Sequence, residues 1–545
     1  MISHSPSPSA AGCDTTTAPP SRPKVARWHA PAKIGVLVAF VVPLFLVARV
    51  AWAADINATP STLAAAIAQA QPGDTIHLAA GHYAHFSIAN KSGSPGKWIT
   101  LSGPTGNPPT AVVDADLAGC CNTIEITASS YVAIENLLVD GHNVDGAFGV
   151  SAKGGTSPPV HDIRVEGCTF VNHHGSQQHD AISTKTPTWG WIIRNNVIKN
   201  AGTGMYLGNS DGTDPFIGGL IEGNVVENPI GYCMEIKWQK PRPSVVGMPA
   251  NPTSTIIRHN VFIKNDDPSP DGDRPNLLVG GFPATGAGAM DRYEVYGNIF
   301  VHNPRESLMQ ASGRVTIHDN LFVDAPATRA LVLQDHDLPL ELATVYNNTI
   351  YDTGSGIVFG NSAPQGDAVV GNLIFSATPI KGPIQHNTGN LTDSVQNAMN
   401  YVANPSDVVG QMDFYPKPGQ CTGAPLDESS FAMDTDYTVD FNGTPKGTFT
   451  YRGAYAGSGM NPGSDGGVVS APGDGSVDEG PSTHDGAVGD AGHAGDAGEG
   501  SSGAGCGCTT AGGRTRPKGL GALAVMVAAL ALAAISRTSR RSRRR

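Results

Sequence analysis

Apolar and polar residues alternate in one short pattern that recurs along the chain from residue 132 onward. Two or three apolar residues precede a polar pair ending in Asn, then an apolar position and a turn, as in IIRNNVIKN, LIEGNVVEN and VYNNTIYDT. A period of two is typical of a strand whose every second side chain points inward. The marker position recurs every 22 to 38 residues, at Asn136, Cys168, Asn196, Asn224, Asn260, Asn298, Asn320, Asn348 and Asn372. The pattern predicts one coil of short strands per repeat, with insertions confined to loops.

The recurring Asn predicts a ladder inside the coils. An inward Asn at a tight corner can hydrogen-bond to the backbone of its own and neighbouring coils, and a buried amide needs such partners. Cys168 then occupies one rung and has a structural role. At the start of the repeat, STLAAAIAQAQPGDTIHLAAGHY predicts an apolar helix, a turn and a strand. Such a helix would cap the end of the core, as repeat stacks require.

A second strand of each coil places polar side chains on an outer surface. The segments DAISTKT (180–186), TGMYLGN (203–209) and YCMEIKW (232–238) align on inward Ile182, Met205 and Met234. The outward columns then contain Ser183, Tyr206 and Glu235, followed by Lys185, Gly208 and Lys237. Because neighbouring strands lie about 4.8 Å apart, we expect Lys185 and Lys237 about 10 Å apart. A slip of one residue would turn these side chains inward.

The repeat resembles the right-handed parallel β-helix proteins of the pectate-lyase-like superfamily. The resemblance spans roughly residues 55–455, and both the opening phrase and the closing VDFNGTPKGTFTYRGAY are similar to that superfamily's ends. It implies an all-β fold, a right-handed parallel β-helix (solenoid) with an N-terminal capping helix. It implies little about activity, because one fold can carry many functions.

Charge narrows the functional classes. Residues 55–452 carry 21 Lys and Arg against 38 Asp and Glu, a net charge of −17, which excludes a nucleic-acid binder. Residues 181–320 carry 12 of those basic residues and 13 acidic ones, a net charge of only −1. The two longest insertions, after Asn224 and Asn260, lie in the same window. Since function concentrates in loops on a rigid scaffold, we expect a cleft there.

The candidate chemistry is attack on an acidic polysaccharide. β-Elimination needs a cation to neutralise a uronate carboxylate, a base for the neighbouring proton and a donor for the leaving oxygen. The candidate catalytic residues are Lys185, Glu235, Lys237 and Arg258. The candidate substrate-binding residues are Tyr206, Gln239, Lys240, Arg242, His259, Arg274, Asn276, Gln334 and His336.

Other functions stay open. Hydrolysis needs two carboxyls about 5–10 Å apart, and Asp180, Asp211, Asp214 and Glu235 are available for it. A non-catalytic glycan-binding or adhesin-type surface protein is the alternative outside enzymes. Asp211 and Asp214 lie in a segment that reads either as a calcium loop or as a polar turn.

Known lyases of this fold give a further comparison. One group, which includes alginate lyases and chondroitinase B, uses a Lys and an Arg beside a calcium ion held by Asn and Glu. Lys237, Arg258 and Glu235 are similar in chemistry, but the group's NG-x-E and KS-x-x-N signatures are missing here. The group's site is therefore not transferred to this chain.

The two ends of the chain predict export to the cell surface. Residues 1–54 have basic residues, an apolar run and Ala51-Trp52-Ala53, the features of a signal peptide. Residues 456–505, rich in Gly, Ala and Asp, predict a disordered tether. Residues 506–545, with Cys506-Gly507-Cys508, an apolar run at 519–535 and terminal arginines, resemble the myxobacterial C-terminal sorting tag. The resemblance implies sorting machinery as a partner and contact with the membrane through 519–535 before processing.

Cysteine usage adds one restriction. The predicted β-helix contains five cysteines, Cys120, Cys121, Cys168, Cys233 and Cys421, so they cannot all pair within one chain. The Cys and His spacings of a zinc site are absent from the sequence.

Overall fold

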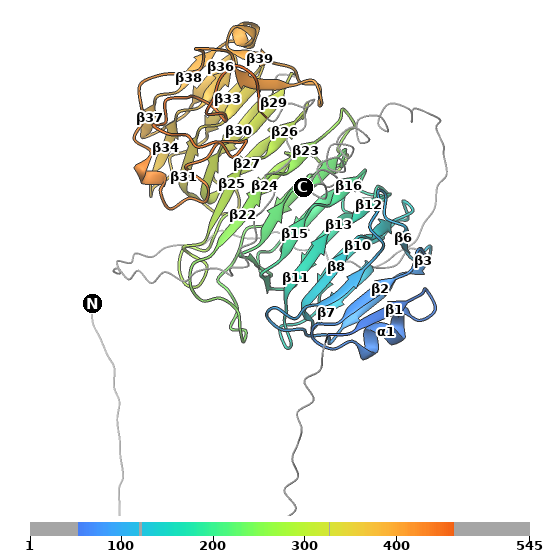
Figure 1. Ribbon diagram of the computed structural model, residues 1–545. Coiled ribbons are helices and arrows are strands. Elements are labelled where there is room, and N and C mark those ends of the chain that lie inside the picture. The colour runs from blue at the N-terminus through green and yellow to red at the C-terminus, as the bar shows by residue number, and fades with distance from the viewer. Residues whose placement is uncertain (1–52, 119–121, 326–327, 463–545) are drawn as a thin grey trace, which may run out of the picture. The chain divides into compact units, whose positions relative to one another are not determined.

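The chain winds as a right-handed parallel β-helix, as the repeat predicts. The structure is a computed structural model that describes residues 53–118, 122–325 and 328–462 (Figure 1). Each coil contributes one strand to each of three long sheets, in which all strand pairs are parallel. We call them sheet 1, sheet 2 and sheet 3, in the order in which the chain enters them.

Sheet 1 contains β1 (Asp55–Ala58), β2 (Thr75–Leu78), β5 (Ile99–Ser102), β8 (Ser130–Glu135), β11 (Val160–Glu166), β15 (Ile192–Arg194), β19 (Leu220–Glu222), β22 (Ser254–Arg258), β25 (Arg292–Tyr296), β28 (Gly313–His318), β31 (Leu340–Tyr346), β34 (Asp367–Val370) and β37 (His386–Thr388), with β14 (Thr188–Trp189) and β18 (Phe216–Ile217) beside them. Sheet 2 contains β3 (Gly81–Ala84), β6 (Ala111–Asp114), β9 (Leu138–Asp140), β12 (Thr169–Val171), β16 (Val197–Lys199), β20 (Val225–Glu227), β23 (Val261–Ile263), β26 (Ile299–Val301), β29 (Leu321–Asp324), β32 (Thr349–Asp352), β35 (Leu373–Phe375) and β38 (Leu391–Asp393). Sheet 3 contains β4 (Phe86–Ala89), β7 (Asn122–Thr127), β10 (Phe148–Lys153), β13 (Asp180–Lys185), β17 (Thr203–Leu207), β21 (Met234–Ile236), β24 (Leu277–Val279), β27 (Met309–Ala311), β30 (Arg329–Leu333), β33 (Ser355–Phe359) and β36 (Thr378–Lys381).

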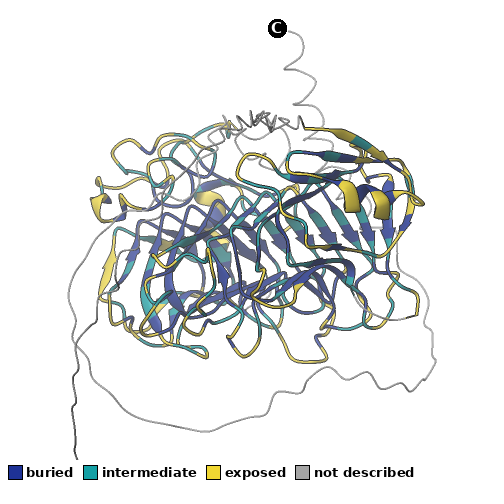
Figure 2. Cartoon of the chain, turned by 90° about the horizontal axis from the view of Figure 1, so that it is seen from below, coloured by how far each residue is buried: buried dark blue, intermediate teal, exposed yellow. Residues whose placement is uncertain are grey.

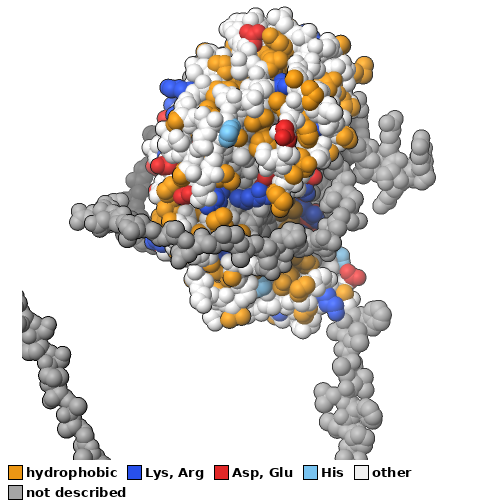
Figure 3. All heavy atoms as spheres, turned by 90° about the vertical axis from the view of Figure 1, so that its left-hand side faces the viewer, with side chains coloured by type: hydrophobic (Ala, Val, Ile, Leu, Met, Phe, Trp, Pro, Cys, Tyr) orange, Lys and Arg blue, Asp and Glu red, His pale blue; other side chains and the backbone are white. Residues whose placement is uncertain are grey.

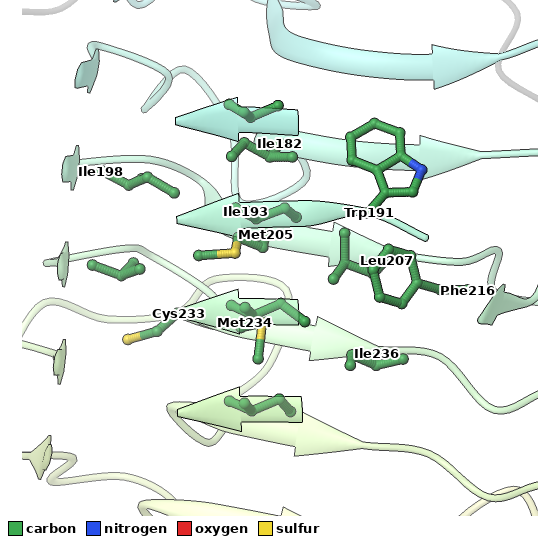
Figure 4. Packing of buried hydrophobic residues seen from close by; sticks show 14 of the residues in the cluster. Ile182, Trp191, Ile193, Ile198, Met205, Leu207, Phe216, Cys233, Met234 and Ile236 are labelled. Atoms are coloured by element: carbon green, nitrogen blue, oxygen red, sulfur yellow. The ribbon is translucent and has the colours of Figure 1, made fainter. Parts of the chain in front are cut away.

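The core lies inside the coils, where alternate side chains of all three sheets meet. Strands are mostly buried, and exposure concentrates in the loops (Figure 2). Ile182, Met205 and Met234 are fully buried and stack in successive coils (Figure 4). Burying a side chain of this size stabilises the fold by roughly 1.5–3 kcal/mol. Each coil buries one such side chain in this column, so each coil adds a similar contribution.

The predicted Asn ladder is present and runs along the corner between sheets 1 and 2. From Asn196 onward each rung donates its Nδ2 to the Oδ1 of the next Asn, over 2.9–3.0 Å. Cys168 occupies a rung as predicted, because its backbone N–H donates to Asn196 Oδ1. Asn390, which the pattern missed, is the last rung.

Asn136 is not a rung, and this part of the prediction is wrong. Thr169 pairs with Leu138, which makes Leu137 the residue at the ladder position of its coil. Asn136 belongs to the preceding column, where Gly167, Asn195 and Gly223 also have a positive φ. Asn is the non-glycine residue that best tolerates this left-handed conformation, so Asn recurs in two adjacent columns for different reasons.

The N-terminal end of the solenoid is covered by a helix, and the C-terminal end leads into a different layer. Helix α1 (Leu63–Gln69) buries Leu63, Ala66 and Ile67 against the first coil, which confirms the predicted cap. At the other end the last solenoid strand stops at Asp393, and residues 394–462 form an outer layer instead of further coils. This layer contains the 3₁₀ helices η1 (Val395–Asn400) and η2 (Ser429–Phe431) and the antiparallel strands β39 (Val402–Asn404) and β40 (Asp413–Pro416).

The outer layer packs on sheets 1 and 2. Phe414 and Phe441 join an apolar cluster with Phe375 and neighbouring side chains of sheet 2. On sheet 1, the Phe431 ring stacks on Tyr346 at 4.1 Å. The closing phrase VDFNGTPKGTFTYRGAY is therefore part of this layer and not a coil.

The end segments mostly fall outside the described residues. The predicted sorting tag (506–545) lies wholly outside the described residues, as do the predicted signal peptide (1–54) apart from residues 53 and 54 and the predicted tether (456–505) apart from residues 456–462. Among the residues described, no helix is both long and apolar enough to cross a membrane. Cys168, Cys233 and Cys421 are buried free thiols, and Cys120 and Cys121 lie outside the described residues.

Candidate active site

Three neighbouring strands of sheet 3 have the register that the sequence predicts. Ile182 pairs with Met205 and Met205 with Met234, while Tyr206 pairs with both Ser183 and Glu235. Two positions further along, Lys185 and Lys237 therefore flank Gly208. A Cβ at Gly208 would lie 3.1 Å from Lys237 Cβ, and its φ of +102° also favours glycine. The bare backbone at this position gives Lys237 room against the strand.

Both lysines bend back over the ring of the tyrosine between them. Lys185 Nζ lies 3.3 Å from the centroid of the Tyr206 ring, and Lys237 Nζ lies 5.8 Å from it. A cation above an aromatic face is attracted by the ring quadrupole. The arrangement concentrates two ammonium groups over one phenol on the outer surface of sheet 3.

Two buried carboxyls hold these ammonium groups. Lys237 Nζ donates to Glu235 Oε1 at 2.7 Å, and Lys185 Nζ lies 3.6 Å from Asp180 Oδ2. Both carboxyl side chains are almost fully buried, whereas the Lys185 side chain is about a third exposed. The acidic groups thus lie beneath the basic ones, and Lys237, with 14% of its side chain exposed, is less accessible than Lys185.

Burial perturbs the titration of this cluster. Desolvation raises the pKa of Asp180 to about 7, against the opposing charge of Lys185 and with help from Glu235. Desolvation also lowers the pKa of Lys185, although Asp180 and Glu235 oppose that shift. Near neutral pH a substantial fraction of Asp180 is therefore protonated, and the two lysines are not fully neutralised.

Two phenols complete the cluster. Desolvation, reinforced by the charge of Glu235, raises the pKa of both Tyr206 and Tyr232. Both phenols therefore keep their protons at any working pH. The Arg274 guanidinium lies 5.7 Å from the centroid of the Tyr232 ring, so this predicted binding residue does reach the cluster.

The sequence does not single out Tyr232, and it indicates Asp180 only as one of four carboxyls available for hydrolysis. Asp180 is the first residue of β13 and Tyr232 lies two residues before β21, at positions where simple alternation would point both side chains inward. The charge of Asp337 also raises the pKa of Tyr232. Gln334 and His336, at the end of β30, thus lie in a loop whose Asp337 is close to the cluster.

Arg258 and His259 lie elsewhere, on sheet 1. Arg258 forms an ion pair with Glu222 and hydrogen-bonds to Tyr296. Burial and the neighbouring Arg258 charge lower the pKa of His259 to about 4. The expected grouping of Arg258 with Lys237 is therefore not found, because the turn after a sheet 1 strand faces the outer layer.

Three further predicted binding residues are buried supports. Gln239 donates to the Phe216 carbonyl, and Asn276 donates to the carbonyls of Phe262 and Val301. Arg242 forms an ion pair with Asp291 in which both side chains are at most 3% exposed. The backbone after Lys237 stays near the surface, where Lys240 is exposed, but the side chains of Gln239, Arg242 and Asn276 are buried and so are not available to a ligand.

The loop after β17 lies at the lysine end of the cluster. Trp238 Nε1 donates to the Ser210 carbonyl, and Lys240 Nζ lies 5.6 Å from the centroid of the Trp238 ring. Asp211 accepts bonds from Thr213, and Asp214 accepts one from Asn209. These contacts are those of a polar turn closed on itself, the alternative to a calcium loop.

Basic side chains are unevenly distributed over the surface. The face on the left of Figure 1 is seen directly in Figure 3, where Lys and Arg gather in a band near the middle. Charged side chains elsewhere on that face are scattered singly. Asp and Glu side chains lie beside this band in the same view, so the band is not a purely basic surface.

The chain was compared with protein-family models, curated proteins and solved structures. No family model and no curated protein matches it. Among solved structures it is similar to an alginate lyase from Paenibacillus sp. str. FPU-7, at 17% identity over 63% of this chain and 98% of that one, with a TM-score of 0.36. It is also similar to the PL6 family alginate lyase AlyGC, at 14% identity over 66% and 55% of the two chains and a TM-score of 0.41. The pectate lyase Pel9A gives 13% identity, coverages of 62% and 81% and a TM-score of 0.37. These likenesses concern the fold, and the chemistry of the sheet 3 cluster is that of this chain's own side chains.

Proposed function

We propose that the chain cleaves an acidic, uronate-containing polysaccharide by β-elimination at the sheet 3 cluster. The observation that carries the proposal is the convergence of Lys185 and Lys237 over the ring of Tyr206. Lys237 offers a cation to the carboxylate of a uronate residue, and Lys185 offers an amine beside it. The raised pKa of Asp180 removes part of the negative charge that would hold Lys185 protonated near neutral pH.

The three steps of the reaction are assigned to three groups. Lys237, held by Glu235, neutralises the uronate carboxylate and so acidifies the proton on the neighbouring carbon. Lys185, in its neutral form, accepts that proton, which its lowered pKa favours over an exposed lysine. The C–O bond to the leaving sugar breaks as the ring C=C bond forms, and the Tyr206 phenol protonates the leaving oxygen.

The test uses the full chain and a panel of uronate polymers that includes alginate, polygalacturonate and hyaluronan. We expect an unsaturated product, detected by its ultraviolet absorbance, from at least one polymer. Lys237→Ala and Lys185→Ala should each lower the rate by at least about 100-fold, the scale of a lost general base or charge stabiliser.

Lys153→Ala is the matched control. Lys153 pairs with Lys185 on the neighbouring strand and bonds Glu125 at 2.7 Å, outside the Tyr206 cluster. Its removal should leave the rate within about twofold. Absence of unsaturated product from every polymer would overturn the proposal, and retained binding would then identify a glycan-binding surface protein.

Hydrolysis is the second candidate, favoured by the two buried carboxyls. Asp180, with a pKa of about 7, suits a general acid, and the charge of Glu235 contributes to that value. A hydrolase would release reducing ends without ultraviolet absorbance. Asp180→Asn should then abolish reducing-end release, whereas in a lyase it should leave Lys237 and Tyr206 in place and reduce the rate less than Lys185→Ala does.

We further propose that the chain is exported and displayed at the cell surface, where such polymers occur. Residues 1–54 and 506–545 carry this proposal through their signal-peptide and sorting-tag features. Surface proteolysis of intact cells, followed by detection of the β-helix, tests it. Protection of the β-helix in intact cells would contradict it.

A further inference from the structure

A second cluster of reactive side chains lies on the outer face of sheet 2, in the first coils of the solenoid. It contains His82 on β3, Asp114 at the end of β6, Asp140 at the end of β9 and His142 in the turn that follows. His82 Nδ1 lies 2.8 Å from one oxygen of Asp114, and His142 Nε2 lies 2.8 Å from the other. None of these residues belongs to the sheet 3 cluster, so the proposed lyase chemistry does not account for them.

The strand register forces two like charges together. Asp114 pairs directly with Asp140 in the parallel ladder, and like charges opposite each other destabilise a sheet. His142 has a carboxylate near each ring nitrogen, because its Nδ1 also lies 3.8 Å from Asp140 Oδ1. Together the four side chains offer carboxylate oxygens and imidazole nitrogens, the atoms with which proteins hold divalent metal ions.

The donor set indicates the kind of cation. One ligand atom each from Asp114, Asp140 and His142 lies within 4.8 Å of the others. Calcium and magnesium prefer oxygen ligands alone, whereas imidazole nitrogen with carboxylate oxygen suits zinc and its neighbours. A tetrahedral zinc ion with bonds of about 2.0–2.2 Å would draw these atoms closer together.

The surroundings orient the ligands. The Asp140 carboxylate accepts bonds from Asn172 Nδ2 at 2.9 Å and from the His142 backbone N–H at 2.8 Å. Such outer contacts fix the direction of a ligating carboxylate. His82 is largely exposed, with 73% of its side chain accessible, so it can rotate to supply a fourth ligand.

We propose that His82, Asp114, Asp140 and His142 bind one divalent zinc-type metal ion. The ligands come from three consecutive coils, so the ion would tie together the first strands of sheet 2. Its role would be to stabilise the N-terminal end of the solenoid, independently of the chemistry on sheet 3.

The test is a Zn²⁺ titration of the chelator-stripped full chain by calorimetry, with His142→Gln and Asp114→Asn as variants. His77→Gln is the matched control, because His77 forms a His–Asp pair with Asp55 at 2.6 Å without a second histidine. We expect the wild type and His77→Gln to bind one equivalent more than either variant does. Zn²⁺ should also raise their thermal midpoint by a few degrees, with no such rise in the variants.

Circular dichroism and thermal midpoints in chelator establish that the variants are folded, which separates lost binding from lost structure. Equal stoichiometry and equal thermal shifts in wild type and His142→Gln would overturn the proposal. The four side chains would then form hydrogen bonds without binding a metal ion, and any bound Zn²⁺ would be held by other histidines.

Discussion

At the scale of single residues, the two lysines of sheet 3 have different environments and are assigned different tasks. Lys237 is held by a 2.7 Å bond to Glu235, which suits a fixed positive charge. Lys185 has a longer contact with Asp180, and burial lowers its pKa. A lysine that acts as a base must be neutral, and the environment of Lys185, which lowers its pKa, favours that form.

Substitution by arginine separates the two tasks. Arg stays protonated at all working pH values, so it can replace a fixed charge but not a base. We expect Lys185→Arg to lower the rate of unsaturated product formation by at least about 100-fold, and Lys237→Arg to lower it about 10-fold or less. Equal losses in both variants would contradict the assigned roles.

The pH profile checks the same assignment. Because the base acts in its neutral form, the wild-type rate should rise with pH as Lys185 deprotonates, with a midpoint below that of an ordinary lysine. A rate that falls across that range would instead favour a protonated carboxyl, and therefore the hydrolytic alternative.

At the scale of strands and coils, the Asn ladder joins neighbouring coils through buried amides. Asn298 donates Nδ2 to the carbonyls of Ile257 and Tyr296 and to Asn320 Oδ1. It also accepts bonds from Asn260. Its removal leaves several buried polar groups without partners, each costing about 1–3 kcal/mol.

Asn298→Ala should therefore lower the free energy of unfolding by about 3 kcal/mol or more. Chemical denaturation measures this. Asn397→Ala is the control, because Asn397 is exposed and makes one bond to Asp393. A loss of only a few tenths of a kcal/mol in Asn298→Ala would show that the ladder follows from the coils and does not stabilise them.

The elements also show what the sequence can and cannot predict. Period-two alternation places Ile182, Met205 and Met234 in one inward column. A shift of the strands by one residue would expose all three apolar side chains to solvent. Alternation does not show to which of the three sheets a strand belongs. The sequence therefore groups Arg258, at the end of a sheet 1 strand, with Lys237, which follows a sheet 3 strand. Nor does it reveal side-chain reach: Asp180 contacts Lys185 only because the lysine folds back over Tyr206.

At the scale of the whole molecule, buried titratable groups couple the fold to pH. Burial raises the pKa of Asp180, Asp319, Asp352 and Glu428 to about 7. Burial also lowers the pKa of His173 and His259 to about 4 and that of His318 to about 3. The acids come from sheet 3, from sheets 1 and 2 and from the outer layer, so the effect belongs to no single element.

The change of stability with pH has one sign for the buried acids and the opposite sign for the buried histidines. For the acids, the folded state holds protons that the unfolded state has lost, so stability falls as pH rises towards and through 7. For the histidines, the unfolded state binds protons that the folded state excludes, so stability rises with pH up to about 6.5. Below about pH 6.5 the acids and the histidines change stability in opposite directions. Above about pH 6.5 only the acids still change it.

The free energy of unfolding should therefore fall between pH 6.5 and pH 8, by the order of 1 kcal/mol for each of the four acids. Denaturant titrations at the two pH values measure the change. Asp352 gives the cleanest single test, because among the described residues its buried Oδ2 has no hydrogen-bond partner and its Oδ1 accepts a bond from the Gly354 N–H. Asp352→Asn removes the titrating group and should reduce the fall in unfolding free energy between pH 6.5 and pH 8 by the contribution of one acid. Exposed Asp427→Asn is the control and should leave that fall unchanged.

A wild-type stability that is constant or rises from pH 6.5 to pH 8 would mean that these carboxyls are not held protonated by the fold. The raised pKa of Asp180 would then no longer favour the neutral form of Lys185 that the proposed base needs.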